Sequence, residues 1–142
     1  MPEGLRLLHQ AGYKLAVVTN QSGIGRGRFR LSDYQRFQDH LVSDLAAHRI
    51  PIEGSFFCPH IPEAGCACRK PEPGLLLQAR SALGACLEHS WVIGDQPRDV
   101  EAARRAGCRG AVQITGRRAL REARDLLEAA RAIVAEEASP DP

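Results

Sequence analysis

The run KLAVVTN at residues 14–20 is continuously apolar and rich in β-branched residues. A run of this kind is typical of a strand that is buried on both faces, as in parallel sheets covered by helices. Shorter runs of similar character occur at 54–58, 90–95 and 110–115, and helical patterns separate them. Strands that alternate with helices at this spacing predict a three-layer, Rossmann-like α/β domain with a parallel sheet.

Apolar residues at helical spacing predict five helices. The expected helices are 5–11, which stops at Gly12; a helix with Ser32 as its N-cap that runs through Leu45; 75–83; a helix from Pro97 that stops at Gly107; and 119–137. We expect a glycine-rich loop at 21–30 and a loop rich in Pro, Gly and Cys at 59–74. Residues 1–138 are predicted to form one domain, and 139–142 a disordered tail.

Charge and composition exclude several classes of protein. Nineteen Lys and Arg residues are interspersed with 17 Asp and Glu residues, so the chain has no electrostatic footprint for duplex nucleic acid or an anionic membrane. Aromatic residues make up only 5% of the chain, which disfavours a zinc-knuckle protein that stacks on bases. No apolar run approaches the length of a membrane span, and the first ten residues do not resemble a signal peptide. We therefore expect a cytoplasmic protein with reduced cysteines.

Four soft ligands lie within eleven residues, in the pairs Cys58-Pro59-His60 and Cys66-Ala67-Cys68. In an extended chain residues i and i+2 project to the same side, so each pair can close on one ion while the loop between them folds back. The alternative is a chance cluster of small buried side chains. A Cys₃His set fills all four positions of a tetrahedral zinc ion and leaves none for a reactive water. The sequence therefore predicts a structural Zn²⁺ site.

Other polar residues follow the predicted strands at the carboxyl edge of the sheet, where α/β folds bind ligands. Thr19 and Asn20 end one strand, and Asp95 ends another, with Asp99 one helical turn later. Asp95 fits a ligand of a hard cation such as Mg²⁺ and Asp99 a supporting carboxylate, although Asp99 could equally complement a helix dipole. Lys70 could hold a phosphate or could be an ordinary surface lysine.

The segments VVTNQSG, CPH…CACRKPEPG and GDQPRDVEAARRAG, in this order, resemble the haloacid-dehalogenase-like (HAD-like) phosphatase superfamily. The similarity is to its zinc-containing branch of D,D-heptose 1,7-bisphosphate and histidinol-phosphate phosphatases, and it extends from Pro2 to about Gly116. The resemblance implies that Thr19 and Lys70 stabilise the transferring phosphoryl group and that Asp95 binds Mg²⁺. It also implies four substrate-contacting residues: Asn20, Gln21, Ser22 and Arg69.

The chain departs from this family in one respect. Family members begin with a strand carrying D-x-D-G-T, whose first aspartate attacks phosphorus and whose second is the general acid and base. The chain has no aspartate before Asp33. In the family this strand lies between those that match 14–20 and 90–95. We therefore expect an N-terminally incomplete domain that lacks its central strand, through a mis-called start or a fragmentary gene.

The leading hypothesis is a magnesium-dependent phosphatase that removes the 7-phosphate of a heptose bisphosphate through an aspartyl-phosphate. A histidinol-phosphate phosphatase is the alternative within the branch. A hypothesis of another class is an inactive, zinc-stabilised module that binds phosphorylated ligands or a partner chain that supplies a strand. The oligomeric state is not predicted.

Overall fold

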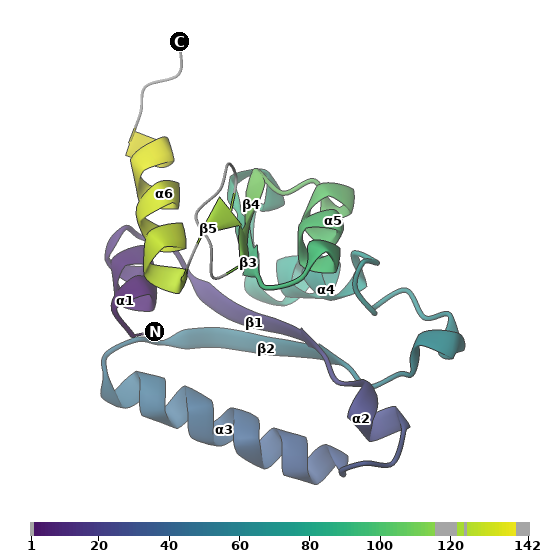
Figure 1. Cartoon of the computed structure of the whole chain (residues 1–142). Helices are drawn as coiled ribbons and strands as arrows, with labels where there is room; N and C mark the ends of the chain where they lie inside the picture. The colour runs from purple at the N-terminus through teal and green to yellow at the C-terminus, as the bar shows by residue number, and fades with distance from the viewer. Residues whose placement is uncertain (1, 116–121, 124, 139–142) are drawn as a thin grey trace.

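A computed structural model describes residues 2–115, 122–123 and 125–138, in which strands and helices alternate along the chain (Figure 1). The helices are α1 (Pro2–Gln10), α2 (Ser22–Gly25), α3 (Leu31–Ala47), α4 (Gly74–Leu83), α5 (Pro97–Ala106) and α6 (Leu126–Ala138). Short 3-10 turns lie at Pro62–Ala64 (η1) and Leu87–His89 (η2). The strands are β1 (Leu15–Asn20), β2 (Ile52–Cys58), β3 (Trp91–Gly94), β4 (Gly110–Ile114) and β5 (Glu122–Ala123).

All three strand pairs are parallel, which confirms the predicted parallel α/β architecture. They belong to two separate sheets, β1-β2 and β3-β4-β5. Among the described residues, β1 and β3 share no hydrogen-bonded ladder and have no strand between them. The two sheets are therefore not joined between β1 and β3, which is where the resemblance to the family places its central strand.

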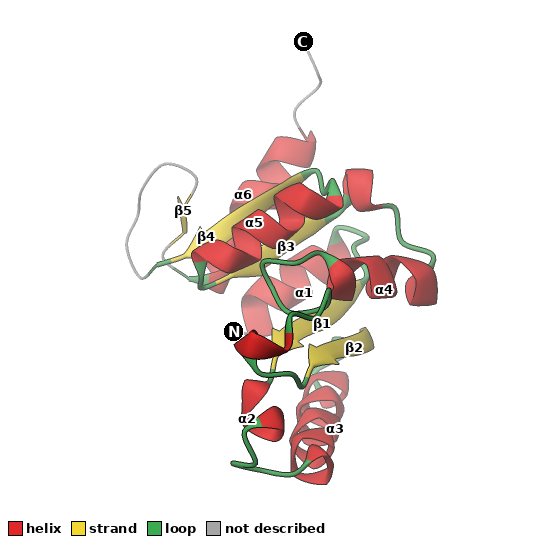
Figure 2. Cartoon of the chain, turned by 90° about the vertical axis from the view of Figure 1, so that its right-hand side faces the viewer, coloured by secondary structure: helices red, strands yellow, loops and turns green. Residues whose placement is uncertain are grey.

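Helices lie on both faces of the strands (Figure 2). Helix α4 packs against β1 and β2, and α5 packs against β3 and β4. Helices α1, α3 and α6 contact the strands as well, and they share one core cluster with β1 and β4. These contacts give the three layers that the alternation of strands and helices predicted.

The core is aliphatic, as the low aromatic content requires. Leu8, Leu45, Ile50 and Ile133 are buried in one cluster that joins the first half of the chain to α6. Burying such side chains is the main favourable contribution to folding. None of the described helices is long and apolar enough to cross a membrane.

Three elements differ from the prediction. Four residues of the expected glycine-rich loop form α2. Helix α3 begins at Leu31 after an N-cap at Arg30, not at Ser32, because the Asp33 carboxylate accepts a hydrogen bond from the Arg30 N–H (3.0 Å). The predicted helix 119–137 was wrong in its first part, where Glu122–Ala123 extends along β4 as β5. The predicted tail, 139–142, lies outside the described residues.

Candidate metal and phosphate site

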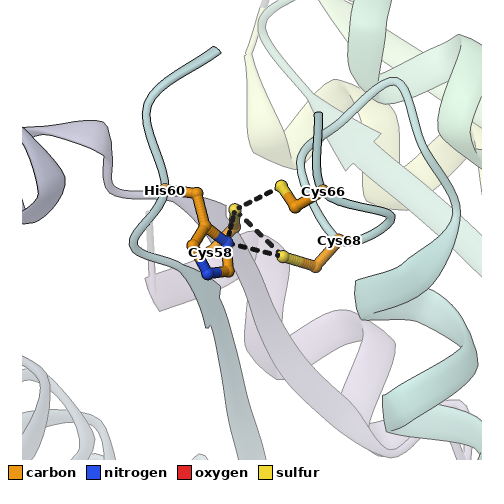
Figure 3. A group of neighbouring side chains, drawn as sticks. All are labelled: Cys58, His60, Cys66 and Cys68. Atoms are coloured by element: carbon orange, nitrogen blue, oxygen red, sulfur yellow. Dashed lines mark hydrogen bonds between the residues drawn. The ribbon is translucent and has the colours of Figure 1, made fainter. Parts of the chain in front are cut away.

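The four predicted zinc ligands converge on one point at the carboxyl end of β2 (Figure 3). Cys58 is the last residue of β2 and is fully buried, His60 follows it, and the loop after η1 brings Cys66 and Cys68 back to them. Cys58 Sγ lies 3.5 Å from Cys66 Sγ and 3.1 Å from Cys68 Sγ. His60 Nδ1 lies 3.4 Å from Cys58 Sγ and 3.3 Å from Cys68 Sγ.

This donor set fits a zinc ion. A tetrahedral Zn²⁺ with bonds of about 2.0–2.3 Å holds its ligand atoms about 3.5 Å apart or slightly more. All four candidate ligand atoms lie within 4.8 Å of one another, so a small adjustment of the side chains accommodates the ion. Three thiol groups and one imidazole are the ligands that zinc prefers at structural sites.

The thiols of the cluster differ in acidity. Burial opposes ionisation of Cys66, but hydrogen bonds from the Arg69 backbone and from the neighbouring thiols outweigh it and lower its pKa to about 6. Burial, together with the thiols and charges of Cys58 and Cys66, raises the pKa of Cys68 to about 12. Cys66 therefore ionises readily, and its negative charge opposes ionisation of Cys68. A bound cation would relieve the repulsion between the two thiolates.

Strand β1 ends in a short polar segment next to this cluster. The Gln21 amide N–H donates to the Cys58 carbonyl (2.7 Å), which ties the chain after β1 to the first cysteine of the cluster. The Gln21 side chain donates to Thr19 Oγ1 (3.1 Å), and Ser22 begins α2. Thr19 and the three predicted substrate residues Asn20, Gln21 and Ser22 thus lie where β1 leads into α2.

Lys70 is held from three directions. Its backbone N–H donates to Asn20 Oδ1 (3.0 Å), and Asn20 Nδ2 donates to the Lys70 carbonyl (3.3 Å). Its ammonium donates to the Val18 carbonyl (3.2 Å) and to Asp99 Oδ1 (2.5 Å). The Lys70 side chain is only 14% exposed and that of Asp99 only 6%. Lys70 is therefore not a surface lysine.

The two aspartates after β3 have different surroundings. Asp95 is exposed directly after the strand. Asp99 is buried, and its second carboxylate oxygen accepts a hydrogen bond from the Gln96 N–H (3.0 Å) at the start of α5. Gly94 permits this arrangement, because a Cβ there would lie 2.3 Å from Asp99 Oδ2. Asp99 therefore lies in the first turn of a helix, as expected, and also forms an ion pair with Lys70. One of its carboxylate oxygens accepts from Lys70 and the other from the Gln96 N–H.

Arg69 directly precedes Lys70 in the same segment. Arg69 Nη1 is buried and has no hydrogen-bond partner among the described residues. A buried cationic group without a partner is costly unless an anion binds to it.

The outer side of α5 carries exposed ion pairs. Arg105 donates to Glu72 Oε1 (2.9 Å) and to Glu101 Oε1 (2.9 Å). From the sequence, neither Arg105 nor Glu72 was singled out as a functional residue. No local pattern could have revealed a pair separated by 33 residues.

The structure therefore brings Thr19, Asn20, Lys70 and Asp99 into one connected group, and the metal cluster adjoins it through Gln21. Among the described residues, no hydrogen bond or ion pair joins Asp95 or Ser22 to this group. The arrangement presents a cation, a hydroxyl and backbone groups at the carboxyl end of β1, with one exposed carboxylate after β3. Such a set can bind and polarise a phosphoryl group.

Comparisons with known proteins agree with this chemistry. The family model described as HAD-hydrolase-like matches residues 67–138, which include Lys70, Asp95 and Asp99. A D-glycero-β-D-manno-heptose-1,7-bisphosphate 7-phosphatase of Helicobacter pylori (strain J99) is 42% identical over 105 residues, covering 73% of this chain and 60% of that protein. The enzyme of the same name from Pseudomonas aeruginosa is 39% identical over 115 residues, covering 81% of this chain and 65% of that protein.

A solved structure is similar as well. The D,D-heptose 1,7-bisphosphate phosphatase from B. bronchiseptica, complexed with magnesium and phosphate, superposes with a TM-score of 0.82 at 30% identity, covering 96% of this chain and 84% of that one. The chain spans less than two thirds of the length of the two curated relatives above. The family match covers half of the chain, and the structural match nearly all of it. The chain belongs to the haloacid-dehalogenase-like hydrolases.

Proposed function

We propose that this chain carries the phosphoryl-binding and metal-binding part of a magnesium-dependent phosphatase that acts on a small sugar bisphosphate. The observation that supports this most directly is the position of Lys70. Its ammonium reaches both the end of β1, at the Val18 carbonyl, and the start of α5, at Asp99. A buried cation between the carboxyl ends of two parallel strands is placed to neutralise a phosphoryl group.

The residues have complementary roles in this proposal. Lys70 and the Thr19 hydroxyl stabilise charge on the transferring phosphoryl group, and Arg69 binds a second phosphate through its unpartnered guanidinium nitrogen. Gln21 and Ser22 contact the substrate beside Thr19. Asp95 would hold Mg²⁺, and a bound Mg²⁺ would neutralise charge on the phosphate oxygens.

The bond-breaking step requires a carboxylate nucleophile in line with the leaving oxygen. In the proposed mechanism this carboxylate attacks phosphorus while the bond from phosphorus to the sugar oxygen breaks, and that oxygen takes a proton and leaves as the sugar hydroxyl. Water then hydrolyses the aspartyl-phosphate, which releases inorganic phosphate and restores the carboxylate. The residues named above bind and polarise the phosphoryl group but are not assigned this role. Asp99 is unsuited to it, because its two oxygens already accept hydrogen bonds from Lys70 and from the Gln96 N–H.

The zinc ion has a structural role in this proposal. Four protein ligands leave no open position at which water or substrate could be activated. Cys68 lies two residues before Lys70, so the ion fixes the loop that presents the phosphate-binding lysine. We further propose that the protein acts in the cytoplasm, where free thiols persist.

The names of the relatives support heptose 1,7-bisphosphate as the substrate, with removal of the 7-phosphate. The H. pylori and P. aeruginosa proteins and the solved B. bronchiseptica structure all carry that substrate in their names. We therefore favour the heptose substrate over the histidinol alternative.

Calorimetric titration of the purified chain with inorganic phosphate in the presence of Mg²⁺ and Zn²⁺ tests the proposal. We expect saturable binding that Lys70→Ala weakens strongly and that the matched variant Lys14→Ala, at an exposed position just before β1, leaves unchanged. Equal binding by the wild-type chain and Lys70→Ala would refute the assignment of the phosphate site. Turnover of heptose bisphosphate and of histidinol phosphate, measured in parallel, distinguishes the two substrates.

A further inference from the structure

The sulfur atoms of the metal cluster are not equally spaced. Cys58 Sγ lies 3.1 Å from Cys68 Sγ and 3.5 Å from Cys66 Sγ. Two thiolates bound to one tetrahedral zinc ion, at about 2.3 Å each, lie about 3.7 Å apart. The sulfurs of Cys58 and Cys68 are closer than this, and they need to approach by only about 1 Å to form a disulfide of about 2.05 Å. This pair is therefore suited to a direct bond as well as to a shared ion.

The two cysteines differ in their access to solvent. Cys58 ends β2 and is fully buried, whereas Cys68 lies in the following loop and is partly exposed. A reagent in solution therefore reaches Cys68 first, and the buried Cys58 reacts only with a sulfur that already lies beside it. An accessible thiol with a second thiol at contact distance is the usual arrangement of a pair that oxidises reversibly.

Cys68 belongs to a tight turn that carries Lys70. The Gly74 N–H donates to the Ala67 carbonyl (3.0 Å), which closes the turn at the start of α4. The closure leaves no room for a side chain, because a Cβ on Gly74 would lie 2.3 Å from the Ala67 carbonyl oxygen. A tie at Cys68 therefore holds a turn that is already closed on itself, whereas Cys66 lies before this turn.

We propose that Cys58 and Cys68 form a reversible disulfide, which replaces the zinc ion as the tie between the end of β2 and the turn that carries Lys70. The two ties exclude each other, since the disulfide leaves only His60 and Cys66 as metal ligands and a structural zinc ion needs four. Oxidation therefore prevents zinc binding but keeps the turn in place, because the two sulfurs are already in contact. In a reducing compartment such a bond forms only transiently.

The oxidant that this step requires is a small-molecule disulfide such as oxidised glutathione. The Cys68 thiol loses its proton and attacks one glutathione sulfur, the glutathione S–S bond breaks, and the first glutathione takes up a proton and leaves as a thiol. The Cys58 thiol then loses its proton and attacks the Cys68 sulfur of the mixed disulfide, and the second glutathione leaves as a thiol in the same way. The two protein thiols lose two electrons in total, and one glutathione disulfide becomes two glutathione thiols. Because thiol–disulfide exchange is reversible, excess reduced glutathione regenerates the four metal ligands.

The test uses the full 142-residue chain, stripped of metal with a chelator and equilibrated with oxidised glutathione. Blocking of the remaining thiols and digestion after Glu63 separate Cys58 from the loop cysteines, and fragmentation of the linked peptides identifies the bond by mass. We expect the loss of two thiols per chain and one disulfide that joins Cys58 to Cys68. The oxidised chain should then bind almost no added zinc, and reduced glutathione should restore close to one ion per chain.

Matched variants separate the two ties. Cys66→Ser loses a zinc ligand but keeps the proposed pair, so oxidation should slow amide hydrogen exchange at Lys70 and Gly74 and raise the affinity for phosphate, each by about tenfold. Cys68→Ser leaves only Cys66, which lies before the turn, so the same treatment should change neither quantity. Cys86→Ser removes an exposed thiol outside the cluster and should behave as the wild-type chain does.

Three results would overturn the proposal. The first is a chain that forms no internal disulfide, or one that in most molecules joins Cys66 to Cys58 or to Cys68. The second is a fully oxidised chain that still binds one zinc ion, and the third is an oxidised Cys66→Ser variant whose exchange at Lys70 and Gly74 is as fast as in the reduced variant. Only the phosphate measurement rests on the proposed function. If the zinc-loaded chain does not bind phosphate, the proposed function fails, and the disulfide map, the zinc content and the hydrogen exchange still decide this inference.

Discussion

Asn20 engages both backbone polar groups of Lys70: its Oδ1 accepts from the Lys70 N–H at 3.0 Å, and its Nδ2 donates to the Lys70 carbonyl at 3.3 Å. The side chain of Asn20 therefore connects the end of β1 to the segment that follows the metal cluster. The resemblance implied that Asn20 contacts substrate. The geometry indicates that its side chain positions Lys70, the lysine proposed to bind phosphate.

Replacing Asn20 by Ala should lower the affinity of the chain for inorganic phosphate about tenfold, because two hydrogen bonds that orient Lys70 are lost. Gln21→Ala is the matched variant, since its side chain bonds to Thr19 and not to Lys70. The measurement is a calorimetric double-mutant cycle. If Asn20 acts through Lys70, the Asn20→Ala effect disappears in the Lys70→Ala background. An effect of the same size in both backgrounds would indicate direct contact with the phosphate.

The purified chain should contain close to one zinc ion, and chelation should unfold the segment from Cys58 to Gly74. The four ligand atoms lie within 4.8 Å of one another, so a bound ion would tie the start of this loop at Cys58 to its return at Cys66 and Cys68. Cys66→Ser should lose the metal and weaken phosphate binding, because a displaced loop misplaces Lys70. Cys86→Ser is the control, since Cys86 is an exposed free thiol outside the cluster. Metal analysis and thermal melting decide the matter: a metal-free chain with an unchanged melting temperature would disprove the zinc site.

The helices and strands followed from the sequence because their signals are local. Apolar runs predicted four of the strands, and glycines marked the ends of helices such as α5 at Gly107, where the backbone has a φ of 80°. Strand β5 was missed because two residues carry no periodicity, and their extension depends on a register with Gln113 and Ile114 that only the fold defines.

The metal cluster and the lysine site differ in how far they could be predicted. The four metal ligands are close in sequence, so their spacing alone revealed them. Lys70 and Asn20 are 50 residues apart, and Lys70 and Asp99 are 29 apart. Residue types suggested that each could act at the carboxyl edge, but the contacts among them depend on how β1, the cysteine loop and α5 pack together.

Asp99→Asn should destabilise the chain by about 2–4 kcal/mol, because it leaves the Lys70 ammonium without its anionic partner in a nearly buried position. The amide keeps only one of the two acceptor oxygens, so the loss includes one hydrogen bond, from Lys70 or from the Gln96 N–H, as well as the charge. Glu101→Gln removes an anion from the exposed ion pairs with Arg104 and Arg105 and should have a much smaller effect. Urea denaturation of the three proteins provides the comparison. Equal losses in the two variants would mean that the buried pair has no special role.

In a complete enzyme that also contains the carboxylate nucleophile, Lys70→Ala should lower turnover by roughly 10²–10³. This is the usual effect of removing one donor that stabilises charge in the transition state. Thr19→Val should have a smaller effect, because a neutral hydroxyl contributes less than a charged donor. Asp95→Asn should weaken Mg²⁺ binding and be rescued in part by higher Mg²⁺ concentrations. Steady-state kinetics over a range of Mg²⁺ concentrations distinguishes these effects. Unchanged turnover in Lys70→Ala would contradict the assigned role.

The 142-residue chain by itself should bind phosphate without hydrolysing heptose bisphosphate or histidinol phosphate, even with Mg²⁺ and Zn²⁺ supplied. Thr19 and Lys70 can polarise a phosphoryl group, and Asp95 can hold the cation, but attack on phosphorus needs a further carboxylate beside β1. Asp99 cannot supply it without giving up Lys70. Phosphate release is the measurement, and Asp95→Asn is the control for contaminating phosphatases. Turnover by the wild-type chain that Asp95→Asn abolishes would show that another residue of this chain acts as the nucleophile.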